Sequence, residues 1–129
     1  MVDTGTAKRI ELIGLATDAG ASARGATMGP EALRIAELAE TLQGLGHTVI
    51  DHGDFRPEES GPKPERRRAE ILAVANHASN TGLDVLNGGG LPVFLGGDHS
   101  ISMGSVSGVA RWCAERGQEL FVLWFDAHG

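Results

Sequence analysis

The pattern of hydrophobic positions along the chain alternates between two periods. Residues 9–16 first alternate polar with apolar side chains and then become apolar throughout, which predicts a strand. Shorter apolar runs at 48–51, from Leu91 onward and at 119–125 predict three more strands, and the one that begins at Leu91 is expected to be central. The last two runs are almost continuously apolar, as in parallel strands that are buried on both faces.

Between these runs the apolar residues recur at helical spacing. Gly-Pro-Glu at 29–31 has the proline and the first-turn acid typical of a helix start, and the apolar residues from position 35 to position 45 share one face. Two further helices are expected, one over 64–86 and one over 101–116. Glycines follow all three predicted helices and are suited to end them.

The order strand, helix, strand, helix, strand, helix, strand indicates right-handed crossovers between parallel strands. We therefore expect an α/β fold with three layers, α-β-α, in which helices cover both faces of a parallel sheet of about four strands. A chain of 129 residues with 41% apolar residues is long enough for one domain with a hydrophobic core. Residues 1–129 are expected to form a single domain.

Composition narrows the partners that this domain can have. The net charge of -6 argues against a nucleic-acid-binding surface, and the basic cluster at 66–68 is expected to be the solvated side of a helix. No apolar run approaches the roughly 20 residues of a membrane-spanning helix, and residues 1–9 lack the apolar stretch of a secretory signal. We expect a cytoplasmic protein whose only cysteine, Cys113, is a small buried hydrophobic residue.

Two of the predicted strands end in a carboxylate and an imidazole. The strand from Leu91 leads into Gly-Gly-Asp-His-Ser at 96–100, and the last strand leads into Asp-Ala-His at 126–128. Open parallel sheets bind ligands at the carboxyl ends of their strands, so these segments are candidates for two halves of one site. Asp126 and His128 are two residues apart and would face the same side. Such oxygen and nitrogen donors suit Mn²⁺, with Zn²⁺ or Fe²⁺ as competitors, and two such metals would activate a water for hydrolysis.

Two alternatives stand beside this metal-site hypothesis. Asp98 could instead form the turn or cap the next helix, with its carboxylate on backbone N–H groups. The glycine-rich loop at 14–29 follows a strand and precedes a helix, as in a dinucleotide-binding fold, but its glycines do not have the spacing G-x-G-x-x-G. A nucleotide-binding role is therefore disfavoured.

Several other polar or aromatic residues are expected to be structural. His52 and Asp54 lie in a turn predicted after the second strand, and that strand is expected at the sheet edge, away from the site. His77 has no partner in the sequence and is expected to face solvent. Trp124 is expected to pack in the core or against a helix rather than to form a stacking platform.

The two segments at 96–100 and 126–128 resemble two sequence signatures of the ureohydrolase family, the arginases and agmatinases. Residues 18–34, which contain the Gly-Pro-Glu-Ala-Leu-Arg helix start, look more like an arginase than an agmatinase. The resemblance implies that His99 is a ligand of one manganese ion, that Asp126 bridges two, and that His128 binds the other. It also implies hydrolysis of a guanidinium group, with L-arginine giving L-ornithine and urea.

The family pattern also includes residues that this chain does not contain. A further carboxylate would follow two residues after His128, and two more would come from a later strand, so only half of the expected protein ligands are present. We therefore expect the N-terminal portion of an arginase, inactive or nearly so by itself. The alternative is a non-catalytic fragment that associates with itself or with the rest of the enzyme. A sheet with an unpaired edge and uncovered apolar faces favours a homo-oligomer.

Overall fold

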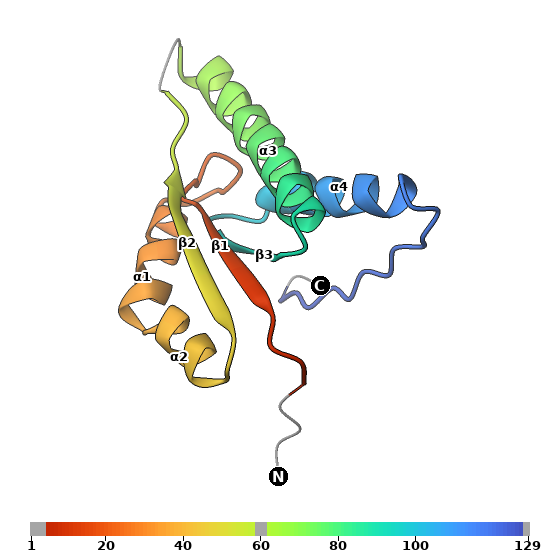
Figure 1. Cartoon of the computed structure of the whole chain (residues 1–129). Helices are drawn as coiled ribbons and strands as arrows, with labels where there is room; N and C mark the ends of the chain where they lie inside the picture. Colours follow the sequence, from red (N-terminus) through yellow and green to blue (C-terminus); the bar gives the residue numbers. More distant parts are fainter. Residues whose placement is uncertain (1–4, 59–61, 128–129) are drawn as a thin grey trace.

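The computed structural model describes residues 5–58 and 62–127. His128, one of the predicted metal ligands, lies outside these residues. The elements are, in order, β1 (Arg9–Leu15), η1 (Ala26–Met28), α1 (Gly29–Ile35), α2 (Leu38–Gly44), β2 (Thr48–Phe55), α3 (Lys63–Asn87), β3 (Leu91–Gly96) and α4 (Ile101–Ala114). Figure 1 shows α1 and α2 on one side of the strands and α3 with α4 on the other.

The three strands form a parallel sheet in the order β2-β1-β3. Leu15, at the end of β1, lies opposite Phe55 of β2 and Gly96 of β3, so the strands end at one edge. The α/β class is confirmed, and β2 lies at a sheet edge as expected. The strand from Leu91 was predicted to be central, and this is wrong for the described sheet. It is β3, which lies at one edge, whereas β1 is the middle strand and pairs with both β2 and β3.

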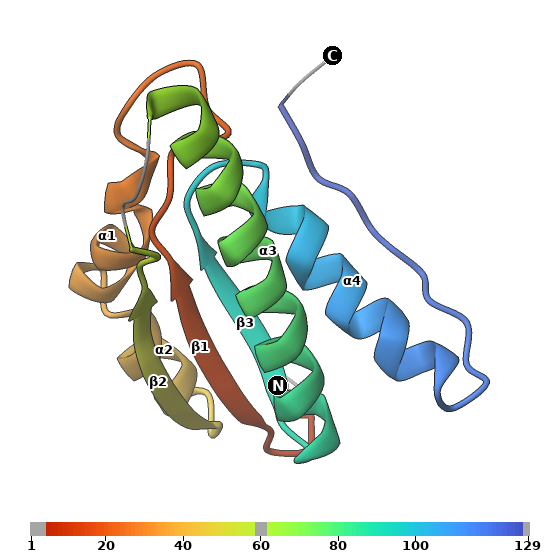
Figure 2. The same cartoon turned by 90° about the horizontal axis from the view of Figure 1, so that it is seen from above.

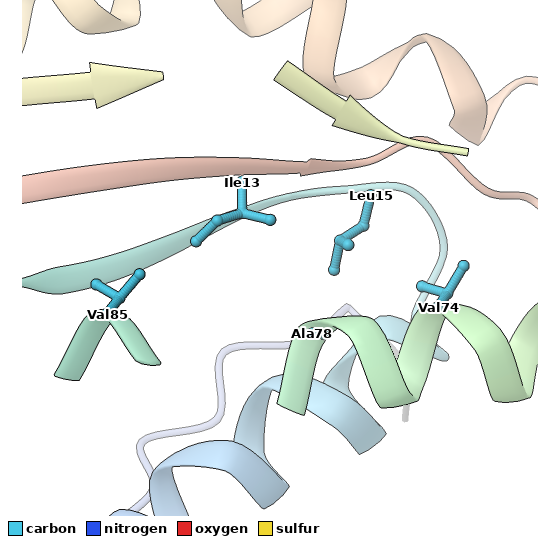
Figure 3. Close-up of a cluster of buried hydrophobic side chains, with 5 residues drawn as sticks. All are labelled: Ile13, Leu15, Val74, Ala78 and Val85. Carbon is cyan, nitrogen blue, oxygen red and sulfur yellow. The ribbon is translucent and has the colours of Figure 1, made fainter. Parts of the chain in front are cut away.

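One face of β1 packs on α3. Figure 3 shows Ile13 and Leu15 pointing toward Val74, Ala78 and Val85 of that helix, and these residues form one buried cluster. Ile13 is 1% exposed and Leu15 is fully buried. Full burial of such a side chain contributes about 1.5–3 kcal/mol, so this cluster fixes α3 on the sheet.

The opposite face of β1 packs on α2. Ile10 and Leu12 alternate with the residues that face α3, and they form a second buried cluster with Leu95 of β3. Leu38 and Leu42 of α2 pack against this cluster. Both faces of the sheet are thus covered by helices, which confirms the expected three-layer α-β-α arrangement.

The single helix predicted from residue 29 to residue 45 is wrong, because two helices occupy this range. Glu37 separates α1 from α2 and adopts a left-handed conformation, with φ 59° and ψ 40°, which a continuous right-handed helix excludes. The break turns α2 so that Leu38 and Leu42 reach the sheet, while Ile35 of α1 remains 74% exposed. Periodicity places these residues on one face of a straight helix and contains no signal for the break.

The two longer helices match their predicted ranges within two residues and lie side by side, as Figure 2 shows. Gly104 and Gly108 of α4 approach the backbone of Ala75 and Ser79 of α3 so closely that a methyl group would collide there. Cys113 of α4 is buried, as expected. Among the helices of the described ranges, none combines the length and the apolar character needed to cross a bilayer.

The fourth strand predicted over 119–125 is not formed within the described chain. The segment 118–126 follows a turn at Gly117, where φ is +62°, and runs back along α4 (Figure 2) without pairing with a strand. Its residues 120–123 line a pocket of about 270 Å³ together with Phe94 of β3 and Val106 of α4. An apolar run has the composition of a strand, but it becomes one only when a neighbouring strand offers backbone groups in register.

Candidate functional site

The loops that follow β1 and β3 meet at the carboxyl edge of the sheet. His99 lies in the turn between β3 and α4, and Asp126 lies near the end of the extended segment 118–126. The Nδ1 atom of His99 is 3.6 Å from Oδ2 of Asp126, with side-chain exposures of 48% and 23%. The structure therefore brings together two of the three predicted metal ligands, although Asp126 does not follow a paired strand. The third, His128, lies outside the described residues.

Trp124 contacts both members of this pair. Its ring centroid lies 5.1 Å from that of His99, at an interplanar angle of 37°. Its indole Nε1–H donates a hydrogen bond of 3.4 Å to Oδ2 of Asp126. Sequence reasoning missed this role and assigned Trp124 to packing. A usable signal was present, because Trp124 and Asp126 are two residues apart and share one face of an extended segment.

The His99–Asp126 pair lies in a pocket of about 430 Å³. Residues of both chain segments line this pocket, which is widely open to solvent. The turn and the start of α4 contribute Gly97, Asp98, His99, Ile101 and Ser102, and the extended segment contributes Leu123, Trp124, Phe125 and Asp126. The pocket is large enough for a hydrated cation or for a small polar molecule.

Asp98 uses its carboxylate on backbone groups. Oδ2 accepts a hydrogen bond of 2.7 Å from the Gly20 N–H, and Oδ1 accepts one of 2.8 Å from the Ser100 N–H. The backbone N–H of Asp98 donates to the Thr17 carbonyl at 3.0 Å. Asp98 is 8% exposed. The turn-forming interpretation of Asp98 is therefore confirmed, and this residue ties the turn that carries His99 to the loop after β1.

The described donors fit a divalent cation in kind but not in number. An imidazole nitrogen and a carboxylate oxygen are ligands of Mn²⁺, Fe²⁺ and Zn²⁺. Two donors on one cation, with bonds of about 2.1 Å, lie about 3–3.5 Å apart, close to the 3.6 Å between His99 and Asp126. Within the described ranges, no group of three or more His, Cys, Asp or Glu side chains is placed to hold a metal ion. The described residues thus provide part of a site.

The other candidate residues are engaged elsewhere, as expected for structural roles. Nε2 of His52 lies 2.7 Å from Oε2 of Glu11, which is 7% exposed. Asp54 accepts a 2.7 Å hydrogen bond from Nη1 of Arg34. The turn predicted at 52–54 is wrong, because these residues continue β2, and the register with β1 shifts beside them. A bulge of this kind keeps the strand paired where sequence alone suggests a turn.

Comparison with known proteins assigns the chain to a family. The arginase family model matches residues 8–129. The chain belongs to the arginase family. The arginase of Agrobacterium fabrum is 44% identical over 126 residues, which cover 94% of this chain and 39% of that protein. The arginase of Bacillus caldovelox is 38% identical over 129 residues, which cover 95% of this chain and 42% of that protein.

Solved arginase structures share this fold. A 1.7 Å crystal structure of Bacillus subtilis arginase is 34% identical and superposes with a TM-score of 0.72 over 81% of this chain and 36% of that one. A Bacillus cereus arginase structure gives a TM-score of 0.71 at 36% identity. This arginase-family chain spans about two fifths of the curated relatives it matches, 39% and 42% for the two named above.

Proposed function

We propose that this chain carries part of the metal site of an arginase-type hydrolase, which converts L-arginine to L-ornithine and urea. The observation that supports the proposal is the 3.6 Å approach of His99 to Asp126 from two segments far apart in the sequence. Membership of the arginase family and the names of the relatives support the substrate. A bound pair of Mn²⁺ ions would supply a water of lowered pKa, which is a nucleophile near neutral pH.

In this proposal the side chains of the pocket have distinct roles. His99 would hold one Mn²⁺ and Asp126 would be shared between two, while His128, outside the described residues, would hold the second. Trp124 orients the Asp126 carboxylate through its indole N–H and covers one side of the His99 ring. Hydrogen bonds of this kind fix the direction of the lone pairs that a ligand offers to a metal. Asp98 holds the turn rather than a metal.

We expect the isolated 129-residue chain to have little or no activity. It offers two described metal donors and spans 39% of the Agrobacterium relative, so the remaining ligands and the substrate-binding groups would come from elsewhere. A sister ureohydrolase that acts on agmatine is the runner-up, because an imidazole and a carboxylate that hold a metal do not distinguish the two substrates. A cytoplasmic location belongs to the same proposal, since a single buried cysteine suits a reducing compartment.

The test is urea release from L-arginine and from agmatine in the presence of MnCl₂. The chain is assayed alone and mixed with the part of the Agrobacterium arginase that its match does not cover. We expect urea from L-arginine only in the mixture, and a fall of about 10–100-fold or more with His99→Asn or Asp126→Asn. His47→Asn is the matched control, because His47 lies outside the pocket and accepts a hydrogen bond from the Lys8 N–H at 3.3 Å.

The variants separate the possible results. Equal urea release by the unsubstituted chain and His99→Asn in the mixture contradicts the proposed metal role. Release from agmatine in preference to L-arginine would favour the sister activity. The absence of both urea release and Mn²⁺ binding in the mixture would remove the enzymatic proposal for this chain.

A second candidate function, association with another chain, has its own supporting observation. Segment 120–125 is apolar throughout, and Phe121, Leu123 and Phe125 are 84%, 83% and 94% exposed. Contiguous exposed apolar surface of this kind marks interaction sites. We propose that this segment, which we call the apolar strip, mediates either self-association into a homo-oligomer or docking onto the remainder of an arginase.

A further inference from the structure

Two side chains in the first turns of α3 contact the loop that follows β1. Nε of Arg67 donates to the Ala19 carbonyl at 3.0 Å, and Nη2 of Arg67 donates to the Ala21 carbonyl at 2.9 Å. Oε1 of Glu70 accepts a 2.6 Å hydrogen bond from the Thr17 hydroxyl. The same hydroxyl accepts a 3.1 Å hydrogen bond from the Ala19 N–H. Arg67 and Glu70 therefore contact every second residue of the loop, at positions 17, 19 and 21.

This loop is in turn the partner of Asp98. The Thr17 carbonyl and the Gly20 N–H bind the backbone and the carboxylate of Asp98, at 3.0 Å and 2.7 Å. Thr17 is fully buried. A methyl group at Gly20 would come within 2.8 Å of the Asp98 carboxylate and of the Ser100 side chain. Loop and turn are thus in close contact, and a shift of the loop must move the turn that carries His99.

We propose that Arg67 and Glu70 are positioning residues for His99. They act through the loop and Asp98 on a metal ligand that they do not touch. The metal part of this inference rests on the proposed function, whereas the mechanical part rests on the hydrogen bonds alone. We call the set formed by Arg67, Glu70, loop 17–21 and Asp98 the loop clamp.

The geometry of Arg67 makes the inference specific. Its planar guanidinium reaches two carbonyl oxygens at once, which a lysine ammonium cannot do in the same geometry. Arg68, the next residue of α3, is exposed and makes no hydrogen bond or ion pair among the described residues. Arg68→Gln therefore removes the same charge from the same helix turn without touching the loop, and it is the matched control for Arg67→Gln.

The first readout is amide hydrogen exchange followed by NMR. In Arg67→Gln we expect the Gly20 and Ser100 amides, which both bind the Asp98 carboxylate, to exchange about tenfold faster than in Arg68→Gln. The Leu12 amide in the core should be unchanged in both variants, which shows that the fold is retained. Equal exchange at Gly20 and Ser100 in the two variants overturns the inference.

The second readout is a Mn²⁺ titration in which paramagnetic broadening of the His99 ring signals reports binding. Residues that orient a ligand typically change metal affinity by about 10–100-fold, so we expect a dissociation constant about tenfold higher in Arg67→Gln than in Arg68→Gln, with Arg67→Lys between them. Faster exchange with an unchanged dissociation constant overturns the role in positioning His99, because the clamp would then act on loop stability alone.

A chain that shows no Mn²⁺ broadening at His99 would count against the proposed function and not against the clamp. In that event the chemical shift of the His99 amide tests the inference. If the loop clamp positions the turn that carries His99, this shift changes in Arg67→Gln and not in Arg68→Gln. Equal shifts in the two variants overturn the inference. If Arg67→Gln does not fold, Thr17→Val replaces it and Thr17→Ser, which keeps the hydroxyl, is its control. The same three readouts then apply to these two variants.

Discussion

At the scale of single residues, His77 is a side chain whose protonation is set by its surroundings. Its ring stacks on Phe55 with centroids 3.9 Å apart and an interplanar angle of 6°. The Thr81 hydroxyl lies 3.4 Å from Nε2. His77 is therefore partly buried and contacts two side chains, whereas the sequence predicted a solvent-facing histidine. Burial lowers the pKa of His77 below its ordinary value of 6.5, because the charged imidazolium is less well solvated there.

This lowered pKa predicts a loss of stability in mild acid. The unfolded chain takes up a proton at His77 as the pH falls through 6.5, whereas the folded chain resists, so the free energy of unfolding declines until the pH is below the folded pKa. Urea unfolding between about pH 7.5 and pH 5 measures the decline. His77→Gln, which cannot titrate, should show a shallower pH dependence. The same slope in both proteins contradicts the prediction.

The candidate site was predictable to the extent that residue type carries the chemistry. The sequence places an imidazole and a carboxylate directly after two predicted strands, which pointed to His99 and Asp126. In the structure, Nδ1 of His99 and Oδ2 of Asp126 are 3.6 Å apart. The roles of Trp124 and Arg67 were not predicted. The Arg67 contacts join residues 46 and 48 positions apart, and no local pattern encodes them. The contact of Trp124 with Asp126 is local, and the spacing of two residues in an extended segment was a usable signal for it.

At the scale of elements, the contact between α3 and α4 depends on two glycines. An added methyl group at Gly104 would collide with the Ala75 carbonyl oxygen, and one at Gly108 with that of Ser79. These positions are four apart on both helices, so they form one continuous line of close approach. The line places α4 against α3, and the start of α4 follows directly on the turn that carries His99.

We predict that Gly104→Ala lowers the free energy of unfolding by about 1–3 kcal/mol, because the helices must separate to admit the methyl group. Gly44→Ala is the matched control: Gly44 ends α2, and nothing lies within 4 Å of the position its methyl group would take. There the higher helix propensity of alanine should leave stability unchanged or raise it. Chemical denaturation measures both variants, and equal changes would disprove the close-packing argument.

Elements with a strong local pattern were predicted well, and those decided by distant partners were not. β1, α3 and α4 lie within two residues of their predicted ranges, because periodicity and flanking glycines act locally. The left-handed residue Glu37 and the unpaired segment 118–126 depend on packing against the sheet and on the availability of a neighbouring strand. These are tertiary effects, which override local preference.

At the scale of the whole molecule, the apolar strip at 120–125 is only partly covered by the described chain. Five consecutive residues within it, 121–125, are each about half exposed or more. Burial of apolar surface is favourable by roughly 25 cal/mol per Å². A second surface that covered the strip would bury several large side chains, and this burial would stabilise the association. The three-layer core forms without the strip, which leaves the strip available for association.

We therefore predict that the chain self-associates, with an apparent mass above the 13.5 kDa of the monomer that rises with concentration in light scattering after size-exclusion chromatography. Leu123→Glu, at an 83% exposed position of the strip, should shift the mass toward the monomer, because a buried carboxylate opposes association. Leu72→Glu makes the same change at a 60% exposed position of α3, outside the strip, and should leave the mass unchanged. A monomer at every concentration, or equal effects of the two substitutions, would show that the strip does not mediate self-association. Docking onto the remainder of an arginase would then be its proposed role.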